Sequence, residues 1–154
     1  MWKTQLNSEV SNDDLFVRHF ETYNLNESLR GGESNNEKFN RAIQKYQSQA
    51  YEESSNILQE LVDENNTNTI FAFSLGQSCL NQKPANLTLA KTQFEKIIAE
   101  GNSIYVPISK WYLALIHIAE NNFSASREVL LDLSKEEGNY RDKASKLLEE
   151  IEQN

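Results

Sequence analysis

The chain has 154 residues, of which 38% are hydrophobic and 25% charged, a composition typical of one globular domain. Fifteen basic residues against 23 acidic ones give a formal net charge of −8. This balance excludes a nucleic-acid partner bound through clustered Lys and Arg, and it disfavours attachment to acidic lipids. The single cysteine, Cys79, excludes an internal disulfide and a cysteine-ligated metal site.

The first predicted unit is an N-terminal arm, residues 1–34. The stretch Ser11-Asn12-Asp13-Asp14 is a helix-start signal, because these side chains cap the first backbone N–H groups. The short helix that follows carries its apolar and aromatic residues on one side: Leu15, Phe16, His19, Phe20 and Tyr23. The arm ends in a linker around the glycine pair at 31 and 32.

From residue 35 to 154 the apolar residues recur every three or four positions, which predicts seven helices. Their apolar faces run through residues 39–46, 51–61, 70–80, 87–98, 107–118, 123–133 and 140–151. The breaks between them are short and polar, so sequential helices should pack as antiparallel neighbours. No stretch alternates as a β-strand does, and the predicted fold class is all-α.

Small residues recur at matching points of these helices. Ala42, Gly76 and Ala114 are separated by 34 and 38 residues, and Ser54, Ala90 and Ser126 by 36 and 36. A large apolar residue follows four positions after each member of the second set. Three copies of one pattern predict a stack of helical hairpins, with these six small residues buried at helix–helix contacts.

This pattern resembles the tetratricopeptide repeat (TPR) over residues 36–133. The resemblance implies a right-handed superhelical stack of three hairpins, at about 36–66, 70–102 and 107–138, with a C-terminal capping helix at 139–152. Asn66, Asn102 and Gly138 stand where the family places a proline. The alternative is an ordinary bundle of unrelated helices.

No residues in the sequence predict an enzyme, a cofactor site or a metal site. His19 and His117 have no partner at metal-ligand spacing. Cys79 falls on a packed helix face, where a thiol behaves as a small inert hydrophobe. The carboxylates are scattered, and the glycine pair lacks the lysine of a phosphate-binding loop.

By the resemblance to the TPR family, the first helix of each hairpin lines a concave groove that holds a peptide. The corresponding positions are Phe39, Ile43, Tyr46, Gln47, Ile70, Phe73, Gln77, Leu80, Asn81, Ile108, Trp111, Leu115 and Ile118. This lining is mostly apolar and has no Lys or Arg, which disfavours the family's clamp for a C-terminal carboxylate. The leading functional hypothesis is a non-enzymatic scaffold or adaptor that binds a protein segment.

An apolar groove in water needs an occupant. A partner segment, a second copy of the chain or the chain's own arm would each fit, and the arm candidates are Leu15, Phe16, Phe20 and Tyr23. We expect Phe16 and Phe20 to contact some of Phe39, Tyr46, Phe73 and Trp111. The alternative hypothesis is therefore a self-associating structural module, possible as a homodimer, whose groove is filled by its own or a neighbouring arm.

The segment from Leu15 to Tyr23 is similar to one in bacterial membrane-anchored TPR proteins. In those proteins a leucine–phenylalanine pair is followed by a second phenylalanine and a tyrosine, with a proline where Thr22 stands here. The segment typically follows a transmembrane anchor. The resemblance implies that this chain is the soluble part of a membrane-tethered protein, with an anchor that would precede Met1.

Overall fold

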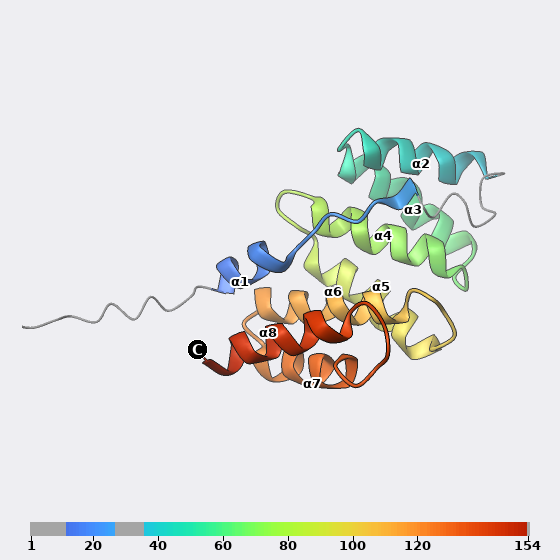
Figure 1. Ribbon diagram of the computed structural model, residues 1–154. Helices are drawn as coiled ribbons and strands as arrows, with labels where there is room; N and C mark the ends of the chain where they lie inside the picture. The colour runs from blue at the N-terminus through green and yellow to red at the C-terminus, as the bar shows by residue number, and fades with distance from the viewer. Residues whose placement is uncertain (1–11, 27–35, 154) are drawn as a thin grey trace, which may run out of the picture.

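The computed structural model describes residues 12–26 and 36–153, and all regular secondary structure in these two ranges is helical (Figure 1). The expected all-α class is confirmed for this part of the chain. The predicted helix-start residue Ser11 and the linker around the glycine pair lie outside it. The helices are α1 Asn12–His19, α2 Glu37–Gln47, α3 Tyr51–Glu64, α4 Thr69–Asn81, α5 Leu87–Glu100, α6 Val106–Ala119, α7 Phe123–Leu133 and α8 Arg141–Gln153.

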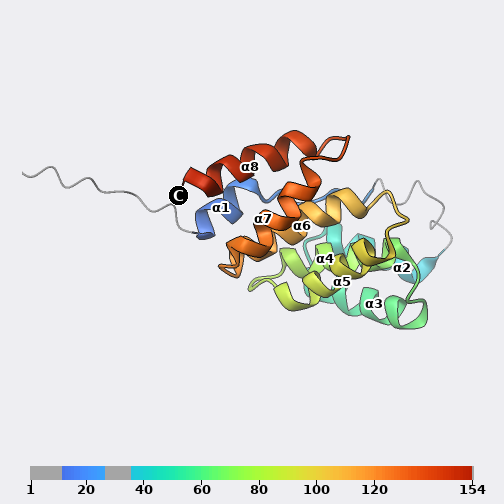
Figure 2. The same ribbon diagram turned by 90° about the horizontal axis from the view of Figure 1, so that it is seen from below.

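From α2 to α8, each helix packs against the helices that precede and follow it in the sequence (Figures 1 and 2). The short polar connections explain this order, since a short loop leaves consecutive helices side by side. Helix α1 is different, because it packs against α6 rather than against its neighbour in sequence, α2. None of the described helices is both long and apolar enough to cross a membrane.

Asparagine side chains start four of these helices. The side-chain oxygens of Asn36, Asn68, Asn86 and Asn122 accept hydrogen bonds from backbone N–H groups in the first turns of α2, α4, α5 and α7. Asparagine is among the best residues for this position, where a first-turn N–H has no partner within the helix. Part of the chain's high asparagine content therefore defines helix boundaries.

The first and third hairpins each contain the same type of hydrogen bond, at matching positions. Ser54 Oγ donates to the backbone oxygen of Ala42 at 2.9 Å, and Ser126 Oγ donates to that of Ala114, also at 2.9 Å. All six of the small residues that define the sequence repeat are buried, as expected. The repeat is thus a shared way of packing α2 on α3 and α6 on α7.

In the second hairpin a glycine takes the place of the alanine. A Cβ atom added to Gly76 would lie 2.7 Å from the Phe94 ring, closer than van der Waals contact allows. That ring packs against Phe73 and stacks on Tyr112, at centroid distances of 6.0 and 5.7 Å. The absence of a side chain at Gly76 therefore lets α4 and α5 meet around Phe94, at the centre of the core.

Candidate binding surface covered by the arm segment

Residues 12–26, here called the arm segment, cross the molecule from α6 to α2 (Figures 1 and 2). Helix α1 lies on α6, and the chain then continues past α4 to α2, so it meets the three hairpins in reverse order. The surface beneath it, here called the arm-binding surface, is defined by residues of four helices that contact it. They are Tyr46 of α2, Phe73 and Asn81 of α4, Trp111 and Tyr112 of α6, and Glu150 of α8.

Aromatic rings make the apolar contacts between the arm segment and this surface. His19 meets Trp111 edge-on at 6.1 Å, and Tyr23 meets Phe73 edge-on at 5.0 Å between ring centroids. Phe20 packs edge-on against Tyr112 at 6.0 Å. Edge-to-face pairs at these distances are favourable beyond the burial of their surface.

We expected Phe16 and Phe20 to contact some of Phe39, Tyr46, Phe73 and Trp111. Phe16 and Phe20 are partly buried against the core to which these four residues belong, and the ring pairs with Phe73 and Trp111 are made by Tyr23 and His19. Phe16 instead stacks on Phe20 at 5.1 Å with an interplanar angle of 10°. Because α1 ends at His19, the side chains of Tyr23 and Leu25 do not point in the directions of a continued helix.

Two tyrosine hydroxyls hold the backbone of the arm segment. Tyr112 Oη donates to the carbonyl oxygen of Glu21 at 2.7 Å, and Tyr46 Oη donates to that of Tyr23 at 2.9 Å. Burial raises the pKa of both tyrosines, so both hydroxyls stay protonated and remain donors across the physiological range.

Asn81 adds a contact to a side chain of the arm segment. Thr22 Oγ1 donates to Asn81 Oδ1 at 2.7 Å, and Asn81 Nδ2 donates to Tyr46 Oη at 3.3 Å. The position of the Asn81 amide is also fixed within its own helix, because Nδ2 donates to the backbone oxygen of Gln77 at 2.8 Å. Asn81 therefore links the Thr22 hydroxyl to the tyrosine that holds the next carbonyl.

Polar contacts of Arg18, His19 and Glu21 connect the arm segment to the last helix. Glu150 Oε2 lies 3.2 Å from both Arg18 Nη2 and His19 Nε2, and Lys143 Nζ lies 3.6 Å from Glu21 Oε2. Partly exposed pairs of this kind contribute at most about 1 kcal/mol each. They fix the orientation of α1 more than they add to the free energy of binding.

Two leucines anchor the arm segment at its ends. Leu15 in α1 and Leu25 beyond Tyr23 are each only 1% exposed. Burying one leucine side chain contributes about 2 kcal/mol. Both ends of the segment are thereby held in the interior while its middle is held by hydrogen bonds.

Of the residues predicted to line the groove, Gln47 is exposed and the others are at least partly buried. Tyr46, Phe73, Asn81 and Trp111 make the ring or hydrogen-bond contacts to the arm segment described above, and Gln47 Nε2 donates a hydrogen bond to Asn26 Oδ1 of the arm segment. Buried in the helix packing or under the arm segment are also Phe39, Ile43, Gln77, Leu80, Ile108, Leu115 and Ile118, and Ile70 is partly buried. The arm candidate Leu15 is buried, and Phe16, Phe20 and Tyr23 are partly buried against the core.

Three residues of this contact between the arm segment and the helices were not predicted from the sequence. Trp111 was predicted to line the groove and its neighbour Tyr112 was not, although both contact the arm segment. Leu25 lies two positions beyond Tyr23, a spacing that places both on one side of an extended chain. Glu150 is one of the scattered carboxylates of the sequence, and no pattern in the sequence connects it with Arg18.

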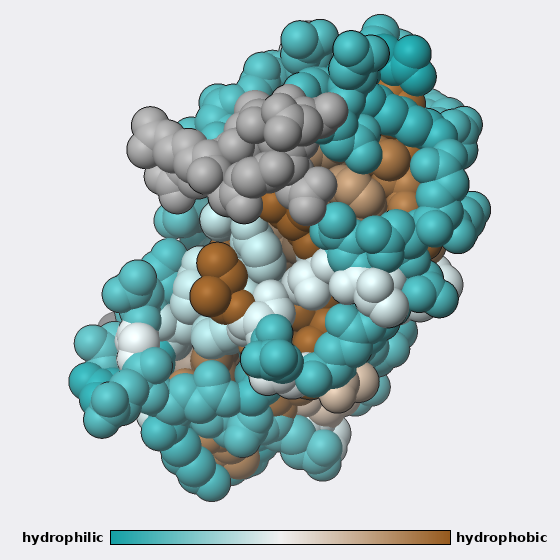
Figure 3. All heavy atoms as spheres, turned by 90° about the vertical axis from the view of Figure 1, so that its right-hand side faces the viewer, coloured by the Kyte–Doolittle hydropathy of each residue, from teal (hydrophilic) through white to brown (hydrophobic). Residues whose placement is uncertain are grey.

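Little large apolar surface remains uncovered in the described part of the chain. Its exposed large apolar side chains are Val17, Ile104 and Leu131. On the face shown in Figure 3, brown apolar surface forms patches bordered by hydrophilic residues. The apolar lining, for which we expected an occupant, is covered by the arm segment and by helix packing.

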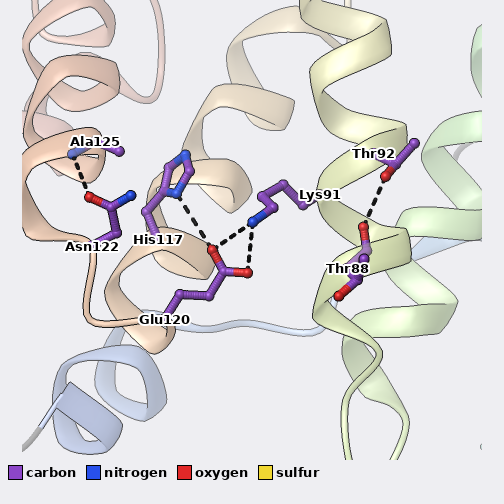
Figure 4. Close-up of polar contacts among 7 residues, drawn as sticks. All are labelled: Thr88, Lys91, Thr92, His117, Glu120, Asn122 and Ala125. Carbon is purple, nitrogen blue, oxygen red and sulfur yellow. Dashed lines mark hydrogen bonds and ion pairs between the residues drawn. The ribbon is translucent and has the colours of Figure 1, made fainter.

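The chemically reactive residues lie elsewhere and serve packing. Cys79 is buried, and burial raises its thiol pKa to about 12, so the thiol stays protonated. Glu120 Oε2 lies 2.8 Å from Lys91 Nζ and 3.8 Å from His117 Nδ1, joining α5 to α6 (Figure 4). The described residues contain no group of three or more His, Cys, Asp or Glu placed to hold a metal ion.

Comparison of the chain with models of protein families, with curated proteins and with solved structures found no significant match.

Proposed function

We propose that this chain is a non-enzymatic TPR-like scaffold or adaptor, a right-handed stack of three hairpins with a capping helix. In this proposal the first helices of the hairpins form a groove that binds an extended protein segment. The arm segment occupies that groove in the resting state, and a partner segment displaces it.

The observation that carries the proposal is the way in which the arm segment is held. Tyr112 and Tyr46 donate to its backbone carbonyl groups, and backbone carbonyls are the same in every polypeptide. Phe73 and Trp111 provide aromatic contacts to Tyr23 and His19 of the same segment. A surface with fixed donors to the main chain and aromatic walls is suited to binding extended peptides.

A second function is favoured by a different observation. Leu15 and Leu25 are buried as deeply as core residues, and α1 is tied to α8 through Glu150. These features suit an arm that is a permanent part of the fold. The chain would then be a structural module that associates through its arm, with no external peptide in the groove.

The test uses the full chain with the double substitution Tyr23→Ala and Leu25→Ala, which weakens the arm segment and leaves the arm-binding surface intact. A displayed library of random peptides is selected against this variant. We expect enriched peptides whose affinity falls about 2- to 10-fold when Tyr46→Phe or Tyr112→Phe removes one hydroxyl donor, since a neutral hydrogen bond contributes about 0.5–1.5 kcal/mol.

The control is Tyr51→Phe, which removes a hydroxyl from a ring that packs on Tyr46 without touching the arm segment's backbone bonds. It should leave peptide affinity unchanged. The proposed scaffold function is contradicted if no peptide is enriched. It is also contradicted if the affinity of the enriched peptides is unchanged by both Tyr46→Phe and Tyr112→Phe. A weakened-arm chain that forms stable dimers instead supports the structural module.

A further inference from the structure

The arm segment shows which features a segment needs to fit this surface. Its buried or ring-packed apolar residues are Leu15, Phe20, Tyr23 and Leu25, at relative positions 0, 5, 8 and 10. The first spacing is set by α1, whose last helical residue is His19. The later spacings of three and two belong to the chain that follows, which is irregular as far as Asn24 and forms a 3₁₀ turn at residues 25 and 26.

The two backbone hydrogen bonds require an extended chain. The carbonyls of Glu21 and Tyr23 are two residues apart and are held by donors from different helices, α6 and α2. Alternate residues of an extended chain present their groups to the same side, whereas residues two apart in a helix do not. A wholly helical segment therefore cannot use both donors.

Polar side chains add selectivity at two places. Asn81 Oδ1 accepts a hydrogen bond from the hydroxyl of Thr22, one residue before Tyr23. Glu150 lies within ion-pair distance of Arg18 and His19, just before the extended stretch. These contacts favour a hydroxyl at position 7 and a basic residue at position 3 or 4, counted from the leucine.

The contacts also define a direction. The basic, helical end of the segment lies on α6 and α8, and its apolar C-terminal end lies toward α2. A segment running the opposite way would place its basic residues away from Glu150. The surface therefore distinguishes the two chain directions by charge as well as by the order of the apolar positions.

We propose that the partner of this surface is a polypeptide segment of another protein that carries the arm's own pattern. That pattern is one helical turn or more bearing a basic residue, followed by an extended stretch, with apolar residues at positions 0, 5, 8 and 10 and a hydroxyl at position 7. This inference rests on the proposed function and names its ligand class.

A partner of this class competes for the arm-binding surface with the arm segment, which carries the same pattern and belongs to the same chain as the surface. The tether gives the arm segment a high effective concentration, in the millimolar range for short flexible connections. The apparent affinity of a partner is reduced by the fraction of time in which the surface is covered. Weakening the arm segment should therefore reveal binding that the unaltered chain conceals.

The test uses a labelled synthetic peptide of residues 12–26 and the full chain with Tyr23→Ala and Leu25→Ala. We expect the peptide to bind this variant at least 10-fold more tightly than it binds the unaltered chain, measured by fluorescence anisotropy. A peptide with Leu25→Ala should bind at least 10-fold more weakly, and a peptide of reversed sequence should not bind. A peptide with Thr22→Val should bind the weakened-arm chain several-fold more weakly than the original peptide does. When the weakened-arm chain also carries Asn81→Ala, the Thr22→Val peptide should show no further loss of affinity.

Several outcomes would overturn the inference. One is equal binding of the reversed peptide, and another is no binding of the 12–26 peptide to a chain that does bind library peptides. The latter refutes this ligand class and leaves the proposed function standing, whereas a chain that binds neither refutes both. The remaining case is that the arm of a second copy of the chain occupies the surface, and the mass of the unaltered chain in solution tests it. We expect a monomer; a dimer that exchanges arms would make a second copy the occupant.

Discussion

Glycine 76 illustrates how one missing side chain shapes the core. The position could be predicted as small from the repeat, but the reason for glycine rather than alanine could not. That reason is the Phe94 ring, which is fixed by Phe73 and Tyr112 and leaves no room for a Cβ atom. Sequence periodicity gives the face on which a residue lies, not the distance to the ring opposite.

Gly76→Ala should destabilise the chain although alanine is the better helix former. The added methyl group would lie 2.7 Å from Phe94, and overpacking of this kind costs about 1–3 kcal/mol. Gly76→Leu should cost more. The measurement is the free energy of unfolding in urea.

Phe94→Leu serves as the matched control, because it removes the ring that the methyl group would meet. The cost of Gly76→Ala should be smaller in the Phe94→Leu background than in the unaltered chain. Equal costs in both backgrounds would show that the two side chains do not oppose each other.

His117 makes the free energy of unfolding depend on pH. Burial lowers its pKa below the ordinary value; the charge of Lys91 acts in the same direction, while Glu120 opposes it. A base with a lowered pKa binds protons more readily in the unfolded chain, so its contribution is present above about pH 6.5 and is lost as pH falls.

We therefore expect His117→Gln to lose less stability than the unaltered chain between pH 7 and pH 5, measured by urea unfolding at each pH. Glu120→Gln removes the opposing charge and should make the loss steeper. An identical pH dependence in the unaltered chain and in His117→Gln would contradict this role.

Among the elements, the helices were the most predictable and the arm segment the least. Apolar residues three and four apart fall on one side of a helix whatever it packs against, so α2 to α8 could be read from spacing. The arm segment changes after His19 from helix to irregular chain, with a 3₁₀ turn at residues 25 and 26. A helical interpretation continued to Tyr23 did not predict that His19 pairs with Trp111 and Tyr23 with Phe73, and it gave no reason to include Leu25.

Removal of the arm should have consequences for the elements beneath it. Deleting residues 1–30 uncovers Phe73, Trp111 and Tyr112, which pack against Tyr23, His19 and Phe20. We expect stronger fluorescence of an apolar-surface dye, a lower melting temperature and a tendency to form oligomers.

Deleting residues 1–11 alone is the matched control, because it keeps the whole arm segment. It should behave as the full chain does in all three measurements. If the chain lacking residues 1–30 is also monomeric, has the same melting temperature and gives the same dye fluorescence, the arm segment does not cover a significant apolar surface.

At the scale of the whole molecule, local and distant contacts have different origins. Contacts among α2 to α8 join helices adjacent in the sequence, and their repeated small residues make them predictable. The contacts of Glu150 with Arg18 and His19 join the two ends of the chain. No periodicity relates residues so far apart, so this part of the candidate site required the structure.

The separation of 131 residues between His19 and Glu150 also sets an order of events during biosynthesis. A ribosome that adds about 5–20 residues per second needs about 7–26 s to pass from one to the other. The arm segment is thus among the first parts of the chain to be made, and its binding site is complete only when the last helix emerges. Until α6 emerges, Phe20 lacks its contact with Tyr112, and the apolar residues of the arm segment are accessible to chaperones that recognise exposed apolar residues.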